Sequence, residues 1–309
     1  MMDMNKKDER IIWAATRSAL ENGHKKNMRN GASGVRYWDL FEKGLTLLVW
    51  LLKLVRLYDR GHHQALDVKI EKHQLTYSEL PESFNNFRIL HLSDLHLDAD
   101  PETTASIIKA INQLEYDLCV MTGDFRLKTH GRYKQLVPLL QKLVQNIQAK
   151  SGIYATLGNH DTYRMVADFE ALGINVLCNE TINLTKGAHQ IALTGTDDVH
   201  YYFTENAIDC LENTPDGFKI ALVHSPELYD VASENKYNLY LCGHTHGGQI
   251  CLPGGKALLI HLYNGKHLSK GLWKNKDMIG YTSEGCGTSG IPIRFNSQSE
   301  ITLFTLQKG

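Results

Sequence analysis

Five short clusters of aspartate, histidine and asparagine carry residue types that bind divalent metal ions. In chain order they are Asp94-Leu95-His96, Gly123-Asp124, Gly158-Asn159-His160-Asp161, His224 and Gly243-His244-Thr245-His246. Imidazole, carboxylate and amide groups together suit Mn²⁺, Fe²⁺ or Zn²⁺ better than Ca²⁺, which prefers sites made of oxygen atoms. The clusters therefore predict a centre for divalent metal, with Mn²⁺ as the first candidate and Fe²⁺ or Zn²⁺ as alternatives.

Each cluster directly follows a short apolar run that is typical of a buried strand. The runs cover residues 87–93, 118–122, 153–157, 218–223 and 238–242. Short runs rich in β-branched and aromatic residues, bounded by turn residues, indicate strands. Binding sites in open α/β sheets form at the carboxyl ends of the strands. The five clusters are therefore expected to meet at one place.

The number of ligands indicates two metal ions that share one carboxylate. The expected ligands are Asp94, His96 and His246 for one ion and Asn159, His224 and His244 for the other, with Asp124 bridging the two. Ions bridged in this way lie about 3.5–4 Å apart and activate a water molecule for in-line attack on phosphorus. The predicted activity is hydrolysis of phosphate esters or anhydrides without a covalent phospho-enzyme.

Four further residues are candidates for contact with the substrate. His160 is expected to act on the leaving-group side as a general acid or charge stabiliser, with Asp161 orienting its imidazole. Arg126 and Arg164 are candidate phosphate clamps, with surface ion pairs as the alternative for both. The remaining histidines lack this context and are expected to be ordinary surface or hydrogen-bonded residues; they include His91, His200 and His261.

The composition is that of a globular protein with a substantial core. The 309 residues are 42% hydrophobic and 22% charged, and the net charge is −1. Residues 1–60 hold 12 Lys and Arg against 7 Asp and Glu, whereas residues 61–309 hold 21 against 27. A basic arm ahead of an acidic body indicates an anionic surface as the partner of the arm, and the acidic body disfavours nucleic acid. The six cysteines show no framework spacing and are expected to be reduced, as in cytosolic proteins.

The first 60 residues are expected to form a polar arm and an amphipathic helix. Residues 1–36 lack the apolar segment of a signal peptide and predict a partly disordered arm with a short helix around residues 11–13. Residues 37–60 predict a helix with a wide apolar face. Its uncharged stretch over residues 44–52 spans only about 13 Å, against about 30 Å for the hydrocarbon core of a bilayer.

The helix over residues 37–60 is therefore expected to lie in a membrane interface, with Trp38, Trp50 and Tyr58 as anchors. Packing on the catalytic core or on a second subunit is the alternative. A single pass through the membrane stays open if Lys53 and Arg56 extend to the headgroups.

Residues 61–86 are expected to form a connector with a strand over residues 66–70, and residues 87–309 a catalytic domain. The candidate helices of that domain cover residues 102–115, 133–148, 165–172, 205–211 and 226–232, and its later strands cover residues 250–252, 278–282 and 300–306. Strands that alternate with helices and then give way to further strands favour an α/β fold with two packed sheets and helices outside.

Residues 87–306 resemble the calcineurin-like metallophosphoesterase superfamily, whose core motifs are all present. The resemblance implies a four-layer αββα sandwich around a dinuclear metal centre. One departure is Arg126, where many members carry an acidic or a small residue.

Several later segments are similar to one branch of this superfamily. They cover residues 243–249 with Pro253, 284–288, 291–295 and 299–301. The branch holds bacterial membrane-associated phosphodiesterases of the YaeI and YkuE type and the chlamydial-type UDP-2,3-diacylglucosamine pyrophosphohydrolases of lipid A synthesis. The resemblance implies a peripheral protein at the cytoplasmic face of the inner membrane, with a phosphorylated lipid or nucleotide sugar as its substrate.

Two other functions remain open. One is a phosphodiesterase or phosphomonoesterase for soluble substrates, and the other is a scaffold without turnover, which the complete ligand set disfavours. The segment over residues 252–273 is expected either to cover acyl chains or to form a plain hairpin with a surface loop.

Overall fold

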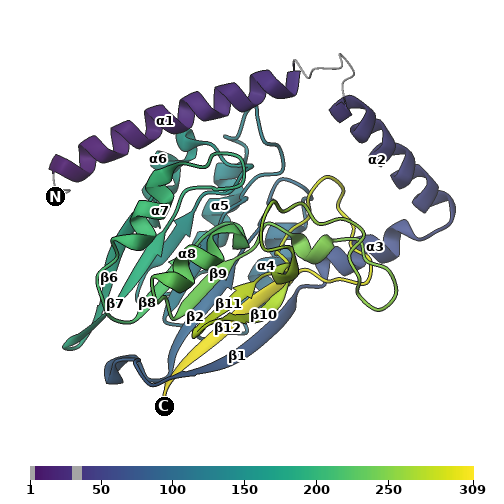
Figure 1. The fold of residues 1–309 in the computed structure, drawn as a ribbon. Coiled ribbons are helices and arrows are strands. Elements are labelled where there is room, and N and C mark those ends of the chain that lie inside the picture. Colours follow the sequence, from purple (N-terminus) through teal and green to yellow (C-terminus); the bar gives the residue numbers. More distant parts are fainter. Residues whose placement is uncertain (1–3, 30–36) are drawn as a thin grey trace.

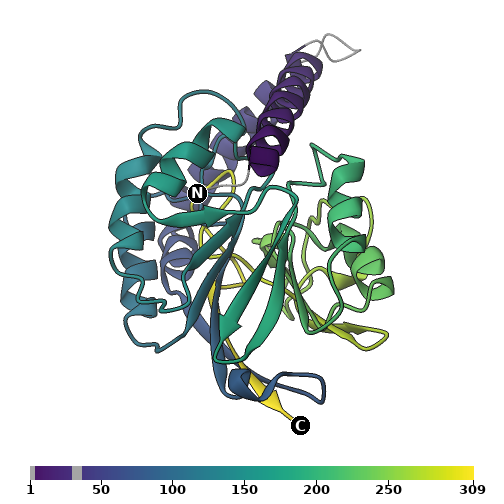
Figure 2. The same cartoon turned by 90° about the vertical axis from the view of Figure 1, so that its left-hand side faces the viewer.

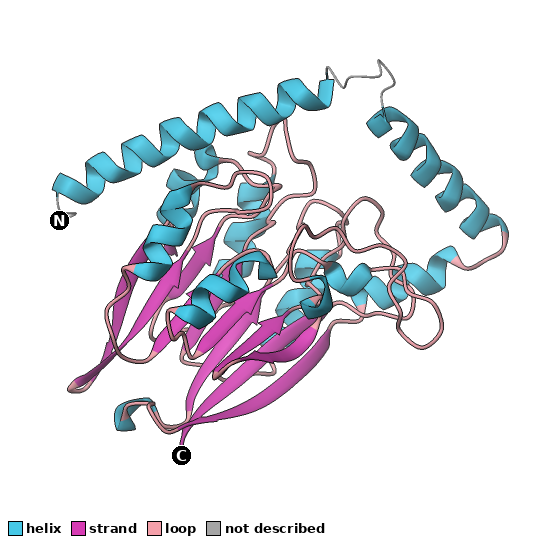
Figure 3. Cartoon of the chain, in the orientation of Figure 1, coloured by secondary structure: helices cyan, strands magenta, loops and turns pink. Residues whose placement is uncertain are grey.

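Two six-stranded sheets pack face to face at the centre of the protein. The computed structural model describes residues 4–29 and 37–309. Helices cover the outer face of each sheet, so the layers follow the order helix, sheet, sheet, helix (Figure 1, Figure 3). This arrangement confirms the α/β fold and the four-layer sandwich predicted from the sequence.

The first sheet has the strand order β1-β12-β2-β3-β4-β5. Its strands are β1 Lys69–Tyr77, β2 Phe87–Leu92, β3 Leu118–Thr122, β4 Ile153–Thr156, β5 Ile174–Val176 and β12 Glu300–Lys308. Strands β2 to β5 run parallel, while β12 is antiparallel to β2 and parallel to β1. The carboxyl ends of β2, β3 and β4 therefore meet at one edge of this sheet.

The second sheet has the strand order β10-β11-β9-β8-β7-β6. Its strands are β6 Glu180–Lys186, β7 His189–Gly195, β8 Lys219–Leu222, β9 Leu239–Cys242, β10 Gly271–Asn275 and β11 Met278–Thr282. The four central strands run parallel, and β6 and β10 pair antiparallel at the two edges. The ends of β8 and β9 bring the two remaining ligand clusters to the same side of the molecule.

Apolar side chains fill the space between the sheets and beneath the helices. Ile89, Val120, Ile220, Leu241 and Phe304 lie between the sheets and are fully buried. Helices α4, α5 and α6 cover the first sheet, and α7 and α8 cover the second (Figure 2). The bounds are α4 Thr103–Ile111, α5 Leu136–Val144, α6 Val166–Ala171, α7 Glu205–Glu212 and α8 Tyr229–Glu234, with short 3-10 turns at Glu82–Phe84, Tyr163–Met165, Pro226–Leu228, His246–Gly248 and Lys266–Leu268. All six cysteines are free thiols.

Some predicted boundaries are wrong. The strand expected over residues 250–252 is reduced to single bridges. Residues 61–86 are more than a connector, because β1 pairs along its whole length with β12 and belongs to the first sheet. Four strands were not predicted, β5, β6, β7 and β10, which are short or place polar residues at exposed positions. β5, β6 and β10 lack the apolar run by which buried strands are recognised. The apolar run of β7 is buried but covers only residues 191–193.

The described part of the expected disordered arm is a long helix. α1 spans Met4–Arg29, and residues 1–3 and 30–36 lie outside the described residues. It runs across the top of the molecule in Figure 1, above the loops that follow the strands. Trp13 and Arg17 are buried against these loops. Contacts with distant parts of the chain stabilise this helix. Because these contacts are not visible in a local sequence pattern, the helix was not predicted at its full length.

Two helices replace the single helix expected over residues 37–60. α2 spans Tyr37–Leu54 and α3 spans Tyr58–Leu66. They meet at a sharp turn in which Arg56 has a φ of 59°. The side chain of the expected anchor Trp38 lies outside the described residues.

The described part of α2 keeps a large apolar face in solvent. The side chains of Leu47, Trp50 and Leu54 are between 57% and 65% exposed. This face is therefore not packed on the catalytic core, although Leu45 of the same helix lies next to Gly290. Among residues 4–29 and 37–309, no helix has the length and apolar character needed to cross a bilayer.

Candidate metal centre

Sharp backbone turns at the strand ends direct the predicted ligands toward one another. Five of them have a left-handed φ: Asp94 at 50°, His96 at 38°, Asp124 at 57°, His244 at 74° and His246 at 52°. Residues other than glycine rarely adopt this conformation, and such strain gathers at functional sites. These turns bring the seven predicted ligands together in two adjoining clusters.

The first cluster consists of Asp94, His96 and His246, which are all buried. The Nε2 atoms of the two histidines lie 3.2 Å apart, and Oδ1 of Asp94 lies 3.5 Å from Nε2 of His246. Ser93 donates a hydrogen bond of 2.7 Å from Oγ to Oδ2 of Asp94, and the backbone N–H of His244 donates to the same oxygen at 2.9 Å. These bonds fix the orientation of the carboxylate.

The second cluster consists of Asn159, His224 and His244 beside Asp124. Oδ1 of Asn159 lies 3.0 Å from Nε2 of His224 and 2.9 Å from Nδ1 of His244. The donor atoms of Asp124, His224 and His244 all lie within 4.8 Å of one another. Four potential ligands therefore surround one small volume.

Asp124 stands between the two clusters. Its Oδ2 lies 3.7 Å from Nε2 of His96 in the first cluster and 3.5 Å from Nε2 of His224 in the second. Its Oδ1 accepts a hydrogen bond of 2.8 Å from the backbone N–H of His160. One oxygen is held by the backbone while the other faces both clusters, which is the position expected of a bridging carboxylate.

The second cluster fits a cation because the ring nitrogens of two histidines face each other within it. Nδ1 of His224 lies 2.7 Å from the carbonyl oxygen of Thr122, and Nε2 of His244 lies 2.9 Å from that of His261. A carbonyl only accepts, so these nitrogens carry ring protons and the opposite nitrogen of each ring faces into the cluster. Those two nitrogens are 3.1 Å apart. A bound divalent metal would stabilise this arrangement.

Burial and neighbouring charges set the protonation of these ligands. Burial lowers the pKa of His96 to about 3 and holds the pKa values of His244 and His246 well below the ordinary value, so these rings are neutral at pH 7. Burial also opposes charge on Asp124 and His224, but their mutual attraction outweighs it. The pKa of Asp124 is held well below its usual range and that of His224 is raised well above it.

Binding of Mn²⁺ at pH 7 is expected to release about one proton per protein, because the raised pKa of His224 keeps its ring protonated until a metal displaces the proton. Apparent Mn²⁺ affinity should therefore rise with pH, by up to about tenfold per pH unit while His224 stays protonated. Calorimetric titrations in buffers of different ionisation enthalpy measure the proton count. Equal heats in all buffers would contradict a protonated His224.

The structure contradicts the expected role of Asp161 in orienting His160. The carboxylate of Asp161 accepts hydrogen bonds from backbone N–H groups, including those of Asp124 and Gly158 at 2.8 Å. The ring of His160 is instead oriented by the carbonyl oxygen of Leu127 at Nδ1, and its Nε2 lies 3.8 Å from Oδ2 of Asp124. Asp161 thus ties together the loops after β3 and β4, while His160 stays beside the bridging carboxylate.

Neither expected phosphate clamp points into the metal site. Arg126 is buried, and its guanidinium donates to backbone carbonyl oxygens that include those of Thr129 and His160. Arg164 is exposed and lies over the ring of Tyr163. The clamp prediction is therefore wrong for Arg126, which holds two loops together. Arg164 lies at the surface, where its side chain contacts Tyr163 in place of the ion pair that was the alternative.

Arg294 supports the first cluster and escapes the sequence analysis. It is fully buried and donates to the backbone carbonyl oxygens of His246 at 3.1 Å and Gly287 at 2.7 Å. These bonds hold the loop that carries His246 against the loop after β11. The sequence places this arginine inside an otherwise apolar segment, within the branch-specific residues 291–295, but gives no role for it.

His200 is a second residue whose place the sequence analysis misses. Its ring centroid lies 4.2 Å from that of His244, and its Nδ1 lies 3.0 Å from a carboxylate oxygen of Glu227. It is hydrogen-bonded as expected, but it follows β7 at the same edge as the ligand clusters. Recognition of β7 as a strand would have pointed to this loop.

Comparisons with known proteins show the family to which this chain belongs. Residues 87–248 match the family described as Calcineurin-like phosphoesterase. Metallophosphoesterase YkuE of Bacillus subtilis is 31% identical over 253 residues, which cover 78% of this chain and 86% of the relative. A transmembrane protein with metallophosphoesterase domain from Bos taurus is 31% identical, over 84% of this chain and 61% of the relative. A solved archaeal phosphodiesterase aligns at 14% identity with a TM-score of 0.37, over 65% of this chain and 85% of that one. The chain belongs to the calcineurin-like metallophosphoesterases and is a phosphoester hydrolase.

Proposed function

We propose that the protein hydrolyses a phosphodiester or pyrophosphate bond of an amphiphilic nucleotide lipid, with Mn²⁺ as its metal and UDP-2,3-diacylglucosamine, a precursor of lipid A, as its substrate. The observation that carries the hydrolytic part is the position of Asp124, whose Oδ2 faces both histidine clusters. When bound, two divalent ions would activate a shared water molecule and neutralise charge on the transferred phosphoryl group.

The residues of the chain hold the ligands in place and serve the leaving group. Carbonyl oxygens behind the site orient the rings of His96 and His224, each at 2.7 Å from Nδ1. Rings fixed in this way need no reorganisation during the reaction. The side chain of His160 is partly exposed, and its Nε2 lies 3.8 Å from Oδ2 of the buried Asp124, where it is placed to give a proton to the leaving oxygen.

Two exposed apolar segments support the proposal that the substrate stays in a lipid surface. One is the face of α2 with Trp50 and Leu54, and the other is the loop before β10, where Leu259 is 70% and Tyr263 is 71% exposed. Full burial of each such side chain contributes roughly 1.5–3 kcal/mol. The loop also contacts the metal centre, because it includes the His261 carbonyl that orients a ligand ring. An apolar substrate held by this loop would lie next to the site.

Turnover of UDP-2,3-diacylglucosamine in detergent micelles with Mn²⁺, beside bis-p-nitrophenyl phosphate, tests this function. We expect rapid release of UMP and the acylated sugar phosphate, with slow cleavage of the diester. Cleavage of the diester without lipid turnover would contradict the lipid substrate and favour a soluble phosphodiester. Turnover of neither compound would contradict the proposal as a whole.

Replacing Trp50 and Leu54 together by glutamate is expected to weaken binding to phosphatidylethanolamine–phosphatidylglycerol vesicles by about tenfold or more, since both side chains lose their place in the interface. Lipid turnover should fall with binding, while diester cleavage stays unchanged. Vesicle flotation measures the binding. Leu272→Glu, at a leucine on β10 that is 45% exposed, is the matched control. Unchanged flotation of the double variant would rule out α2 as the membrane contact.

A further inference from the structure

α1 reaches from the outside of the molecule to the loops that carry the candidate ligands. Trp13 donates from Nε1 to Oδ2 of Asp197 at 2.8 Å. Glu21 accepts from Oγ1 of Thr162 at 2.7 Å and from the backbone N–H of Tyr163 at 2.9 Å. Asp197 lies in the loop after β7, and Thr162 and Tyr163 lie in the loop after β4. One side of α1 therefore contacts two loops at the edge where the metal centre forms.

Arg17 extends from the same side of α1 and is buried. Its guanidinium pairs with the carboxylate of Asp197 and donates from Nη2 to the carbonyl oxygens of Gly158 at 3.1 Å and Asp161 at 3.2 Å. The ring of Tyr202 packs on it at 3.9 Å. A buried cation is costly unless it is paired and fully hydrogen-bonded. The planar fork of arginine reaches Asp197 and both carbonyl groups through Nη1 and Nη2, while its Nε makes no hydrogen bond and lies 3.3 Å from Oε1 of Glu21. A lysine would satisfy fewer of these partners.

The two carbonyl groups that Arg17 binds enclose the short turn of Asn159 and His160. One of these residues is a candidate metal ligand, and the other is the expected leaving-group residue. We propose that α1 is part of the catalytic unit, and that Arg17 is a positioning residue that holds Asn159 at the second cluster. A rigid guanidinium fixes both ends of the turn, from Gly158 to Asp161, and so limits the movement of the ligand between them.

This inference rests on the proposed metal-dependent hydrolysis, but it concerns a helix outside residues 87–248, the region that matches the family.

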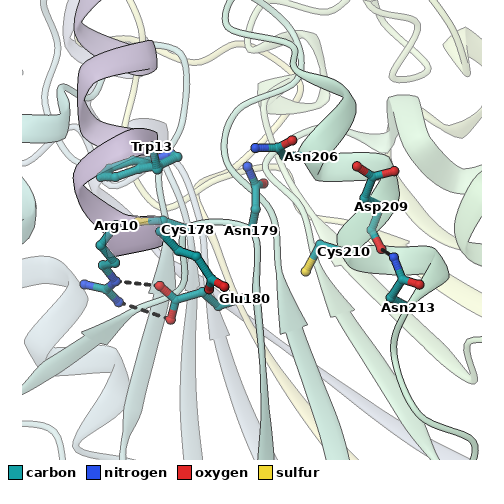
Figure 4. A pocket seen from close by; sticks show the side chains of 10 residues that line it. Arg10, Trp13, Cys178, Asn179, Glu180, Asn206, Asp209, Cys210 and Asn213 are labelled. Atoms are coloured by element: carbon teal, nitrogen blue, oxygen red, sulfur yellow. Dashed lines mark hydrogen bonds and ion pairs between the residues drawn. The ribbon is translucent and has the colours of Figure 1, made fainter. Parts of the chain in front are cut away.

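α1 also contacts the catalytic domain at a second place, near the start of the helix, beside a cavity of about 280 Å³ (Figure 4). There Arg10 pairs with Glu170 and Glu180 and donates to the carbonyl oxygen of Val176. Arg10 thus lies on the same helix as Arg17 and also binds several groups of the catalytic domain, but none of these groups belongs to the metal centre.

Arg17→Ala is expected to weaken Mn²⁺ binding and to lower kcat by about ten- to a hundredfold, the usual effect of losing a group that orients metal ligands. The KM for bis-p-nitrophenyl phosphate should change little. Arg17→Lys should fall between the alanine variant and the unchanged protein, because it keeps the charge and loses the fork. Added guanidinium ion should restore Mn²⁺ affinity in Arg17→Ala, whereas ethylammonium should not. Electron paramagnetic resonance of free Mn²⁺ measures the affinity independently of turnover.

Arg10→Ala is the matched control and should keep Mn²⁺ affinity and kcat within about twofold, since distant contacts act independently. Equal losses in Arg10→Ala and Arg17→Ala would overturn the proposal, because they would report a general loosening of α1. Unchanged Mn²⁺ affinity in a folded Arg17→Ala would overturn it as well.

Glu21→Gln tests the same coupling if Arg17→Ala does not fold, because Glu21 holds Thr162 and Tyr163 from the more accessible surface of α1. We expect a smaller loss of Mn²⁺ affinity, and no loss would overturn the role of α1. Absence of hydrolysis in the unchanged protein would instead contradict the proposed function. The comparison of Mn²⁺ affinities would then still decide whether α1 supports the metal centre.

Discussion

Asp124→Asn is expected to lower kcat by about a thousandfold or more and to remove one of the two Mn²⁺ ions. Oδ2 of Asp124 is the atom that faces both clusters, at 3.7 Å from His96 and 3.5 Å from His224. Asparagine has nearly the same size and still accepts the hydrogen bond from the backbone of His160. The fold should therefore survive while the bridging charge is lost. Hydrolysis of bis-p-nitrophenyl phosphate and calorimetric Mn²⁺ titration measure the two effects.

Asp277→Asn serves as the control for this experiment. Asp277 is exposed in the turn between β10 and β11, away from the strand ends that form the site. Its replacement changes the net charge by the same amount and should leave both measurements unchanged. Turnover close to that of the unchanged protein in Asp124→Asn would exclude a shared carboxylate from the reaction.

Gly158→Ala is expected to reduce kcat by about a hundredfold through steric contact alone. A Cβ at this position would lie 2.2 Å from Oδ1 of Asp124 and 2.8 Å from Cε1 of His224. Its backbone φ lies outside the left-handed region, so alanine adds no dihedral strain. The methyl group must therefore displace the bridging carboxylate or the ligand ring. Overpacking of this kind also costs about 1–3 kcal/mol of folding stability.

Gly23→Ala provides the comparison for Gly158→Ala. Gly23 lies inside α1 with open space around its Cα, and alanine there should stabilise the helix by about 0.5–1 kcal/mol without touching the site. Activity, Mn²⁺ affinity and melting temperature are measured for both variants. Full activity in Gly158→Ala would contradict the prediction. It would mean that the loop shifts without disturbing Asp124 and that close packing of the centre is not needed for turnover.

The five strands before the ligand clusters were predictable because both faces of each strand are buried. A strand such as β3, Leu118–Thr122, is apolar at nearly every position, and the polar cluster begins where burial between the layers ends. The spacing of apolar residues, the turn residues and the apolar character of each strand are all local properties, so they can be recognised in a single sequence. The grouping of Asp94, Asp124, His224 and His244 follows from them.

The supporting contacts were not predictable because sequence neighbours need not face each other. Asp161 follows His160 directly, yet its carboxylate turns to the backbone of another loop. Arg126 lies two residues from a ligand, yet its guanidinium points away from the metals. α1 is polar by composition, and only its contacts with distant loops explain why it is ordered. Long-range pairs of this kind leave no periodic trace in the sequence.

The position of β12 has a consequence for the order in which the protein matures during synthesis. β12 lies between β1 and β2, with Lys69 opposite Glu300 and Thr302 opposite His91. The strand that leads to Asp94 thus lacks one of its two neighbours until residues 300–308 have left the ribosome. Pairing between segments so distant in the chain is slow and comes late in folding. α2 is synthesised more than 200 residues earlier, so the lipid contact proposed for this helix would form long before the chain is able to hydrolyse anything.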